Sequence, residues 1–359
     1  MCGICGELRL DGSASSRATI NRMLVPLRRR GPNHEGSFFS EAVGLGHRRL
    51  SIIDLSEHAN QPITDAASKL SIVFNGTIYN YPQLRKELIQ LGHSFTSSGD
   101  TEVILKGYAQ WGKASVEKLV GMFAFAIWDE NKQELFLARD RMGIKPLYYS
   151  QTKDFFRFAS NTQALLATGE VSSDFDAMGL HHQLTLHAVV PAPTTILKGL
   201  KKLPPAYFMT IDAKGRCSTQ RYWQLRADQI NVTKSEREWQ YEIQAALSLA
   251  IERRLRIADV PVGVLLSGGL DSSLLVGLLA NTGVQNIQTY SVGFEDQPEE
   301  RGNEFEYSDA VVEHFATDHH KFNIHNAEVL KRLPEAVEQM AEPMVGQDAI
   351  AFYLLAEQV

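Results

Sequence analysis

The chain has 359 residues, a length that favours two domains over one. Its composition, 44% hydrophobic and 22% charged, is that of a globular protein, and its net charge of -6 gives no reason to expect nucleic acid or an anionic membrane as a partner. It contains neither an apolar run long enough to span a bilayer nor a secretory signal, so we expect a cytoplasmic protein.

The chain opens with a cysteine directly after the initiator methionine. Removal of Met1 would give Cys2 a free α-amine, whose pKa of about 8 suits a general base near neutral pH. Nucleophile and base would then be carried by one residue, with Gly3 and Gly6 leaving room for a substrate. The alternative is an ordinary N-terminus with a chance cysteine.

The three cysteines are Cys2, Cys5 and Cys217, too few and too scattered for a disulfide framework. Cys2 and Cys5 form a C-x-x-C pair, which leaves a redox pair or half a zinc site as an alternative. No second Cys/His pair with zinc spacing follows, so we expect Cys5 to be a small buried side chain.

Many short strands and a few helices are predicted up to about residue 224. The expected strands span residues 4–10, 43–54, 71–76, 123–128, 134–140, 147–149, 155–159, 206–211 and 219–224. The expected helices span residues 17–28 and 82–91, and a third opens at residues 98–102. This pattern predicts a sandwich of sheets faced by helices.

Three polar positions in this region could bind a substrate. Arg49 could hold a carboxylate by two parallel hydrogen bonds, or form a structural ion pair. Asn75 and Gly76 could donate two hydrogen bonds to an oxyanion, although Asn-Gly is commonly a turn. Asp100 could bind an ammonium group or cap the helix that follows.

The pattern changes after about residue 228. A long amphipathic helix is expected at 234–257, a buried strand at 260–266, an apolar helix to about 281, and a strand at 287–293. Strand, loop, helix and strand in this order are typical of a parallel sheet.

The loop of this unit has the sequence Ser267-Gly268-Gly269-Leu270-Asp271-Ser272-Ser273. It lies where a buried strand meets a helix N-terminus, a place that favours anions. The glycines let phosphate approach the backbone, the serines add donors, and Asp271 could position the loop or hold Mg²⁺. The motif is not a Walker P-loop, and a serine-capped turn is the alternative.

With an N-terminal cysteine and the loop from Ser267 to Ser273, the chain resembles the glutamine-dependent asparagine synthetase family over essentially its whole length. The segments that carry the resemblance are Met1 to Gly6, Arg30 to Pro32, Arg49 to Asp54, Asn75 to Asn80, Asp100 to Glu102, Gly121 to Ala126, Arg139 to Tyr148 and Ser267 to Ser273.

The resemblance implies a fold for each part of the chain. Residues 1–210 would form a class II glutaminase domain, a four-layer αββα sandwich of the N-terminal-nucleophile hydrolase class. Residues 211–233 would be a closing strand and linker. Residues 234–359 would begin an ATP-pyrophosphatase-type domain with a doubly wound parallel sheet, cut short at Val359.

The resemblance also implies roles in the first domain. Cys2 would attack the glutamine amide, and Asn75 and Gly76 would form the oxyanion hole. Arg49 would bind the α-carboxylate of glutamine and Asp100 its ammonium group. The remaining glutamine-binding positions would be Leu50, Ile52, Ile53 and Thr77.

In the second domain the resemblance implies ATP as co-substrate, with Mg²⁺ at Asp271. Leu266 and Val292 would flank the nucleotide, and Ser267, Gly268, Gly269, Asp271, Ser272 and Ser273 would bind its phosphates. A carboxylate would be activated as an acyl-AMP, and ammonia released at Cys2 would travel through the protein to displace AMP.

The chain departs from the family pattern in three places. Thr77 stands where a glutamate is usual after Asn-Gly, which puts the binding of the glutamine amino group in question. Asn33 replaces the usual aspartate after Arg-Gly-Pro. The chain also stops before a second motif of the form Ser-Gly-x-Gly-x-Asp-Glu, so we expect a fragment.

The amidated carboxylate is expected to be aspartate. Residues 187–193, 202–206 and 342–345 are closer to N-acetylglutaminylglutamine amidotransferases, which would make a dipeptide the acceptor. A catalytically silent binding or regulatory paralogue and a plain amidohydrolase remain alternatives. Assembly into a homodimer is left open.

Overall fold

The computed structural model describes residues 1–227, 233–296, 302–344, 346 and 348–358. The chain divides into two compact units, Met1–Ala227 and Asp228–Val359. The first unit contains two antiparallel sheets, and the second contains a parallel sheet.

The first sheet of unit 1 has the strand order β10-β8-β9-β1-β3-β2. Its strands are β1 (Gly3–Arg9), β2 (His34–Ser40), β3 (Val43–Arg49), β8 (Tyr148–Gln151), β9 (Phe155–Ala159) and β10 (Lys201–Lys202). The N-terminal strand β1 is central, paired with β3 on one side and β9 on the other. The residue before it, Cys2, therefore lies at one end of a central strand.

The second sheet of unit 1 has the order β12-β11-β7-β6-β5-β4. Its strands are β4 (Ile63–Asp65), β5 (Leu70–Ile78), β6 (Gly121–Asp129), β7 (Glu134–Arg139), β11 (Tyr207–Asp212) and β12 (Cys217–Arg221). Strand β5, which carries Asn75, is paired with β6 over its whole length.

Side-chain alternation along β6 shows how the layers form. Phe123, Phe125 and Ile127 pack on the helix-covered face, whereas Ala124 and Ala126 pack between the two sheets. Because successive side chains of a strand point to opposite faces, a strand that is apolar at every position is buried on both sides. This sheet is accordingly covered by helices on one face and by the other sheet on the second.

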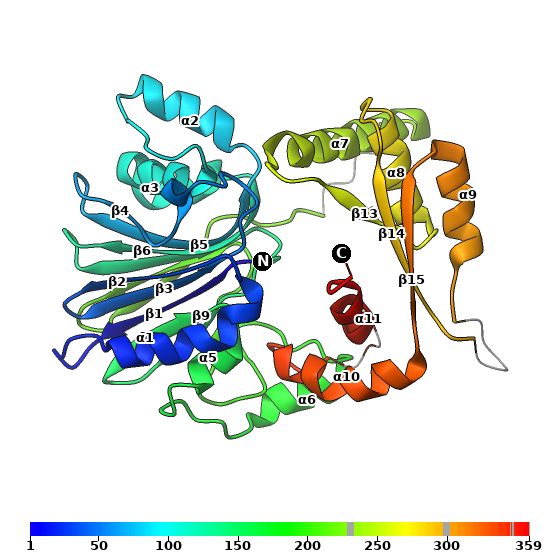
Figure 1. Ribbon diagram of the computed structural model, residues 1–359. Coiled ribbons are helices and arrows are strands. Elements are labelled where there is room, and N and C mark those ends of the chain that lie inside the picture. The colour runs from blue at the N-terminus through cyan, green and yellow to red at the C-terminus, as the bar shows by residue number, and fades with distance from the viewer. Residues whose placement is uncertain (228–232, 297–301, 345, 347, 359) are drawn as a thin grey trace. The chain divides into compact units, whose positions relative to one another are not determined.

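Helices form the two outer layers of the sandwich (Figure 1). The helices α1 (Arg17–Leu24) and α5 (Thr162–Leu166) cover the first sheet, and α2 (Tyr81–Gln90) and α3 (Asp100–Trp111) cover the second. The predicted four-layer order of helix, sheet, sheet and helix is confirmed. The other helical segments of the unit are η1 (Val25–Arg30), η2 (Glu57–Ala59), η3 (Gly112–Ala114), α4 (Ser115–Lys118) and α6 (Ala177–Thr185).

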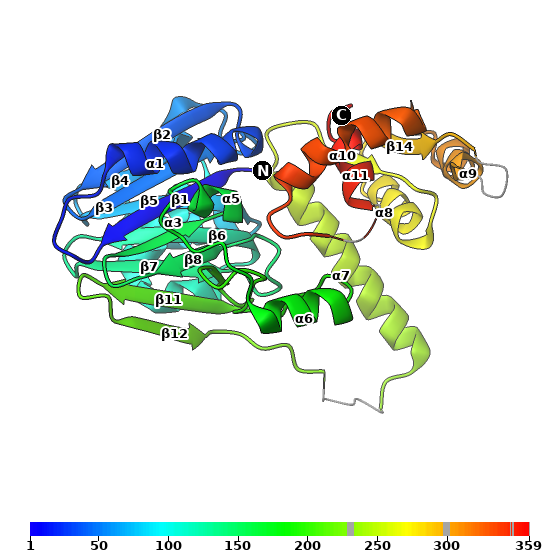
Figure 2. The same cartoon turned by 90° about the horizontal axis from the view of Figure 1, so that it is seen from below.

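Unit 2 begins with the long helix α7 (Glu236–Ile257), which Ser235 and Glu238 start with a capping box. The parallel sheet that follows has the order β13-β14-β15. The elements are β13 (Gly263–Leu265), α8 (Leu270–Ala280), β14 (Gln288–Phe294), α9 (Phe305–Phe315), β15 (Asp318–Ile324), α10 (Asn326–Gln339) and α11 (Asp348–Leu355), seen from a second direction in Figure 2.

Apolar contacts cover both faces of this parallel sheet. Val264 packs with side chains of α7, α8 and α9, whereas Ile324 packs with side chains of α10 and α11. Helices on both faces are what the doubly wound prediction requires. Within the described residues, no helix combines the length and the apolar character needed to cross a membrane.

Several predicted elements differ from the structure in their bounds. The strand expected at 43–54 ends at Arg49, because the arginine side chain draws the following segment into a loop. The helix expected at 17–28 becomes a 3-10 helix at Val25, just before Pro26, which has no backbone N–H to continue it. The strand expected at 260–266 is limited to Gly263–Leu265.

Candidate functional site

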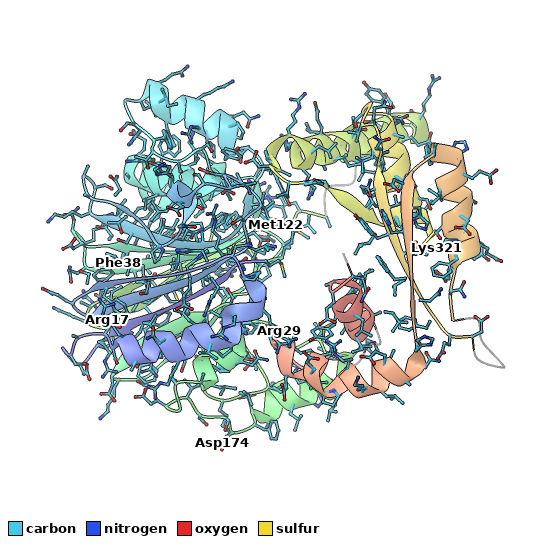
Figure 3. The ribbon with its side chains drawn as sticks, viewed as in Figure 1. Arg17, Arg29, Phe38, Met122, Asp174 and Lys321 are labelled. Atoms are coloured by element: carbon cyan, nitrogen blue, oxygen red, sulfur yellow. The ribbon has the colours of Figure 1, made fainter. Side chains whose placement is uncertain are left out.

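A cavity of about 290 Å³ in unit 1 contains every residue that the sequence suggested for glutamine chemistry. These residues are Cys2, Arg49, Leu50, Ile52, Ile53, Asn75, Gly76, Thr77 and Asp100. They come from the residue before β1, the end of β3 and the loop after it, β5 and the start of α3. Met122 of β6 also lines the cavity and is labelled in Figure 3.

The two sheets bring Cys2 and Asn75 to the same cavity. Ile4 of β1 and Val73 of β5 both pack between the sheets. Because strand side chains alternate, Cys2 shares the inner face with Ile4, and Asn75 and Thr77 share it with Val73. The cavity therefore lies at the end of the sandwich where the inner faces of β1 and β5 open.

The Cys2 thiol is held by the backbone of Leu50. The N–H of Leu50 donates to Sγ at 3.4 Å, and Sγ lies 3.6 Å from the Leu50 carbonyl oxygen. Burial raises the pKa of Cys2, and the backbone hydrogen bond from Leu50 partly opposes that rise. A thiol of this kind needs a neighbouring base to become a nucleophile.

An α-amine lies beside the thiol. The structure begins at Met1, so the amine belongs to Met1 and the nitrogen of Cys2 is in a peptide bond. Burial lowers the pKa of this amine to about 6, with the charges of Arg30 and Lys145 acting in the same direction. The Met1 amine is therefore mostly unprotonated at neutral pH, which is the protonation state that a general base requires.

Asn75 and Gly76 line the cavity next to each other, and within the described part of the chain Asn75 carries an unused hydrogen-bond donor. Asn75 is 1% exposed, and its Nδ2 is buried with no hydrogen-bond partner among the described residues. A buried unpaired donor is unfavourable unless a ligand completes it. Gly76 has no room for a side chain, because a Cβ there would lie 2.2 Å from the carbonyl oxygen of Met122.

Asp100 provides a carboxylate at the N-terminus of α3. It is 5% exposed and accepts a hydrogen bond of 2.9 Å from the backbone N–H of Ile78. Burial raises the pKa of Asp100 to about 7. An ammonium group entering the cavity would supply the missing counter-charge and favour the ionised form.

Arg49 lies at the cavity with its terminal nitrogens engaged by the next loop. Nη1 donates to the Ser56 carbonyl at 2.8 Å and to Asn60 Oδ1 at 2.6 Å. Nη2 donates to the carbonyl oxygens of Ile53 and Asp54. These contacts fix the loop after β3, and the predicted grip on a carboxylate stays a prediction.

Two polar residues that the sequence analysis did not single out hold the cavity walls together. Asp54 accepts hydrogen bonds from Ser56 and, at 2.7 Å, from the backbone N–H of Ser98. Gln61 accepts from the backbone N–H of Phe74 at 2.6 Å and donates to Thr101 at 3.2 Å. Asp54 does lie within the Arg49-to-Asp54 segment of the resemblance, whereas no sequence signal marks Gln61.

Lys145 is a third residue that the sequence analysis did not assign to the site. It is 4% exposed, lines the cavity, and its Nζ lies 3.0 Å from Sδ of Met1. Burial lowers the pKa of Lys145, and the neighbouring charge of Arg30 adds to that effect. The sequence did mark Lys145 indirectly, because it lies within the Arg139-to-Tyr148 segment that carries the family resemblance.

The second predicted centre lies in unit 2, in the loop between β13 and α8. Gly268 has a φ of +86°, a conformation that favours glycine. Ser267 Oγ accepts from the backbone N–H of Gly269 at 3.2 Å and lies 3.1 Å from Ser272 Oγ. Ser273 Oγ donates to the Gly269 carbonyl at 2.8 Å. The serine hydroxyls are thus gathered at the N-terminus of α8.

The residues flanking this loop lie at the carboxyl ends of parallel strands. The N–H of Leu266 donates to the Tyr290 carbonyl at 2.8 Å, so Leu266 follows β13 beside β14. Val292 lies two residues beyond Tyr290 in β14. The carboxyl edge of a parallel sheet is where ligands bind in folds of this class.

Asp271 is exposed in the first turn of α8. Within the residues that the structure describes, no group of three or more His, Cys, Asp or Glu side chains could hold a metal ion. Mg²⁺ is commonly held by one or two carboxylates together with the phosphates of a substrate. The exposed carboxylate of Asp271 could be one such ligand.

Comparison with protein families assigns each unit. Residues 1–223 match the family described as glutamine amidotransferase domain, and residues 242–359 match the family described as asparagine synthase. The first match alone covers more than half of the chain.

Two curated proteins similar to this chain are asparagine synthetases. Asparagine synthetase (glutamine-hydrolysing) 3 of Bacillus subtilis is 34% identical over 94% of this chain and 56% of its own length. Asparagine synthetase (glutamine-hydrolysing) 1 of the same organism is 35% identical over 100% of this chain and 56% of its own length. This chain thus spans about half the length of these curated relatives.

A solved structure of glutamine phosphoribosylpyrophosphate amidotransferase from B. subtilis aligns with 89% of this chain and 65% of its own at a TM-score of 0.47 and 17% identity. The chain belongs to the glutamine amidotransferase domain family through residues 1–223, and it continues into a segment that matches the asparagine synthase family.

Proposed function

We propose that unit 1 hydrolyses glutamine to glutamate and ammonia, with Cys2 as nucleophile. After removal of Met1, the α-amine of Cys2 would take the thiol proton as Sγ attacks the amide carbon. Loss of ammonia would leave a γ-glutamyl thioester, and water would then release glutamate and regenerate the thiol. Arg49 and Asp100 would bind the carboxylate and ammonium groups of glutamine.

The observation that carries this proposal is the pairing of Cys2 with Asn75. Sγ and the unpartnered Nδ2 of Asn75 belong to one small cavity, together with the backbone of Gly76. A thiol opposite unused hydrogen-bond donors is the arrangement that an acyl transfer requires, because charge develops on the amide oxygen as the carbon–sulfur bond forms.

Release of glutamate from glutamine tests the assignment. The variant Cys2→Ala should lose turnover, and Asn75→Ala should lower kcat by about 100-fold to 1000-fold, the usual effect of removing one oxyanion donor. Cys217→Ala is the matched control, because Cys217 is an exposed free cysteine outside this cavity. Wild-type turnover in Cys2→Ala would refute the nucleophile assignment.

For the whole protein we propose an ATP-driven amidotransferase that delivers this ammonia to an activated carboxylate. Support comes from the asparagine synthase match of unit 2 and from the glycine and serine loop at the N-terminus of α8. Ser267 to Ser273 would bind ATP phosphates, Leu266 and Val292 would flank the nucleotide, and Asp271 would be a ligand of Mg²⁺.

We propose aspartate as the acceptor, by analogy with the similar asparagine synthetases. The alternative is a dipeptide, motivated by the sequence of residues 187–193, 202–206 and 342–345. Incubating the full-length protein with ATP, glutamine and either acceptor distinguishes them: asparagine formation supports the first, and amidation of the dipeptide alone contradicts it.

A further inference from the structure

A second cavity lies at the other end of β1 from Cys2. It has a volume of about 380 Å³ and is lined by Glu7 and Arg9 of β1, by residues at the start of α1 and by Arg157 of β9. Glu7 is five residues beyond Cys2, so the Cα atoms of these two residues are roughly 16 Å apart at the usual rise per residue. This cavity is therefore separate from the candidate glutamine site.

The floor of the cavity is a buried arginine. Phe156 and Phe158 of β9 pack between the sheets, so Arg157 stands on the outer face, the one that α1 and α5 cover. Arg157 is 1% exposed, and its register partner across the β1–β9 pair is Glu7.

Arg157 has more hydrogen-bond donors than the protein satisfies. Nε and Nη2 donate to Glu7 Oε1 at 2.8 and 2.7 Å, and Nη2 also donates to Glu170 Oε2 at 2.7 Å. Nη1 is buried and has no hydrogen-bond partner among the described residues. An unpaired buried donor on a charged group is unfavourable, so it marks a place for an acceptor.

The two carboxylates at the cavity are already engaged. Glu7 uses Oε1 for Arg157, and its Oε2 accepts from Ser15 Oγ at 3.0 Å. Glu170 is half exposed and is paired with Arg157. Arg9 forms an ion pair with Asp11 and donates to Ser13 Oγ at 2.9 Å. Arg22, in contrast, is an exposed cavity residue with no ion pair among the described residues.

The N-terminus of α1 opens at the same cavity. Its N-cap, Ser16, makes no side-chain capping hydrogen bond, and its first turn contains no acidic residue. Ser16 and Thr19 both line the cavity, as does Thr168 from the segment after α5. The backbone N–H groups of Thr19 and Ile20 already donate to the Ser16 carbonyl oxygen, so the donors that this end of α1 offers to the cavity are the hydroxyl groups of Ser16 and Thr19.

We propose that this cavity is a binding site for a small oxyanion of the phosphate class, held by Arg157 and Arg22 and by the N-terminal turn of α1. Such a ligand would accept hydrogen bonds from the unpaired Nη1 of Arg157 and from the hydroxyl group of Ser16. The site is independent of glutamine hydrolysis. Its ligand would come either as free phosphate or as the phosphate group of a phosphorylated metabolite.

Calorimetric titration of the whole chain with inorganic phosphate, at fixed ionic strength set by chloride, tests the proposal. We expect saturable one-site binding that Arg22→Gln weakens about tenfold, the usual effect of one charge-assisted hydrogen bond. Arg28→Gln is the matched control, because Arg28 is exposed in the adjoining η1 helix, outside the cavity. Ser16→Ala should weaken binding without removing a charge.

Three results would overturn the proposal: absence of saturable heat, equal weakening by Arg22→Gln and Arg28→Gln, or unchanged binding in both Arg22→Gln and Ser16→Ala. Unchanged glutamate release by these variants would show that they remain folded. Parallel titrations with a nucleoside monophosphate and with a sugar phosphate distinguish the two possible ligands. If either compound binds more tightly than inorganic phosphate, the ligand is a phosphorylated metabolite and not free phosphate.

Discussion

Asp100 combines a fully buried carboxylate with a position at the candidate substrate cavity. Burial raises the pKa of Asp100 from 3.8 to about 7, so the folded chain binds this proton more tightly than the unfolded chain. The stability that Asp100 contributes is therefore complete below pH 3.8 and is lost as the pH rises through about 7. An ammonium group beside Asp100 would stabilise its ionised carboxylate and so oppose the effect of burial.

We predict that Asp100→Asn raises KM for glutamine by more than about tenfold, because a neutral amide offers no charge to the ammonium group. Urea unfolding of the same variant should show a weaker loss of stability between pH 4 and pH 7 than the wild type shows. An unchanged KM would remove Asp100 from the substrate site, and an unchanged pH dependence would contradict its buried, protonated state.

Lys145 lies beside the N-terminus and is expected to tune the base. Burial is the main cause that lowers the pKa of the Met1 amine to about 6, and the positive charges of Arg30 and Lys145 lower it further. Removal of Met1 would leave the Cys2 amine in the same cavity as Lys145, where we expect this charge to act in the same direction. Lys145→Gln should therefore move the acid limb of glutamine hydrolysis to higher pH, whereas Lys145→Arg should leave it in place. The pH profile of kcat is the measurement, and coincident limbs in all three proteins would contradict this role.

At the residue scale, short-range chemistry singled out Cys2, Asn75 and Asp100 as candidates, and all three line one cavity. A cysteine after Met1 and an Asn-Gly pair that follows a run of apolar strand residues are local patterns. Gln61 and Lys145 could not be predicted from the residues alone, because each acts through contacts with segments far away in the chain. Arg49 was placed at the cavity as expected, but its contacts to the following loop depend on how that loop folds.

At the element scale, the loop between β3 and η2 is held by Arg49 and Asp54. Asp54 accepts from the backbone N–H of Ser98, which ties this loop to the segment that leads into α3 and Asp100. Hydrogen bonds to the Asp54 carboxylate lower its pKa to about 2 against the opposing effect of burial. The carboxylate is thus charged throughout the working pH range.

Asp54→Ala should loosen both walls of the glutamine cavity, because two backbone N–H groups lose their acceptor. We expect KM for glutamine to rise more than kcat falls, since Cys2 and Asn75 keep their own contacts. Glu57→Ala, in the η2 helix of the same loop, is the control. An effect on kcat alone would show that Asp54 does not act by shaping the substrate pocket.

The existence of most elements near the site was predictable, but their ends were not. Continuous apolar runs marked β5 and β6 as strands, because each strand is apolar on both faces. The end of β3 was missed because the sequence from Leu50 to Ile53 is apolar enough for a strand, and hydrogen bonds from a single arginine decide otherwise. The local pattern of apolar and polar residues does not show which backbone groups the Arg49 side chain will bind.

At the scale of the whole molecule, the two candidate centres belong to different units. Glutamine hydrolysis should therefore survive changes in the loop between β13 and α8. We predict that Asp271→Asn weakens the binding of ATP with Mg²⁺ while glutamate release in the absence of ATP stays within about twofold of wild type, since charge changes in another unit are normally additive.

Nucleotide binding by Asp271→Asn can be compared with that of Glu313→Gln, an exposed substitution in α9 that also removes one negative charge. Equal ATP affinity in Asp271→Asn and in the wild type would show that Asp271 has no part in nucleotide or metal binding.

The two-unit organisation was predicted from a change in the sequence pattern, from short strands to a strand, loop and helix that favour a parallel sheet.

The most direct test follows the N-terminal peptide by mass spectrometry after acid quenching of the protein during glutamine turnover. The peptide is expected to begin at Cys2, without Met1, and to carry a γ-glutamyl group on Sγ that disappears once glutamine is exhausted. Full glutamine turnover by protein that retains Met1, or turnover with the γ-glutamyl group on another residue, would contradict catalysis by a thiol and an amine on the same residue.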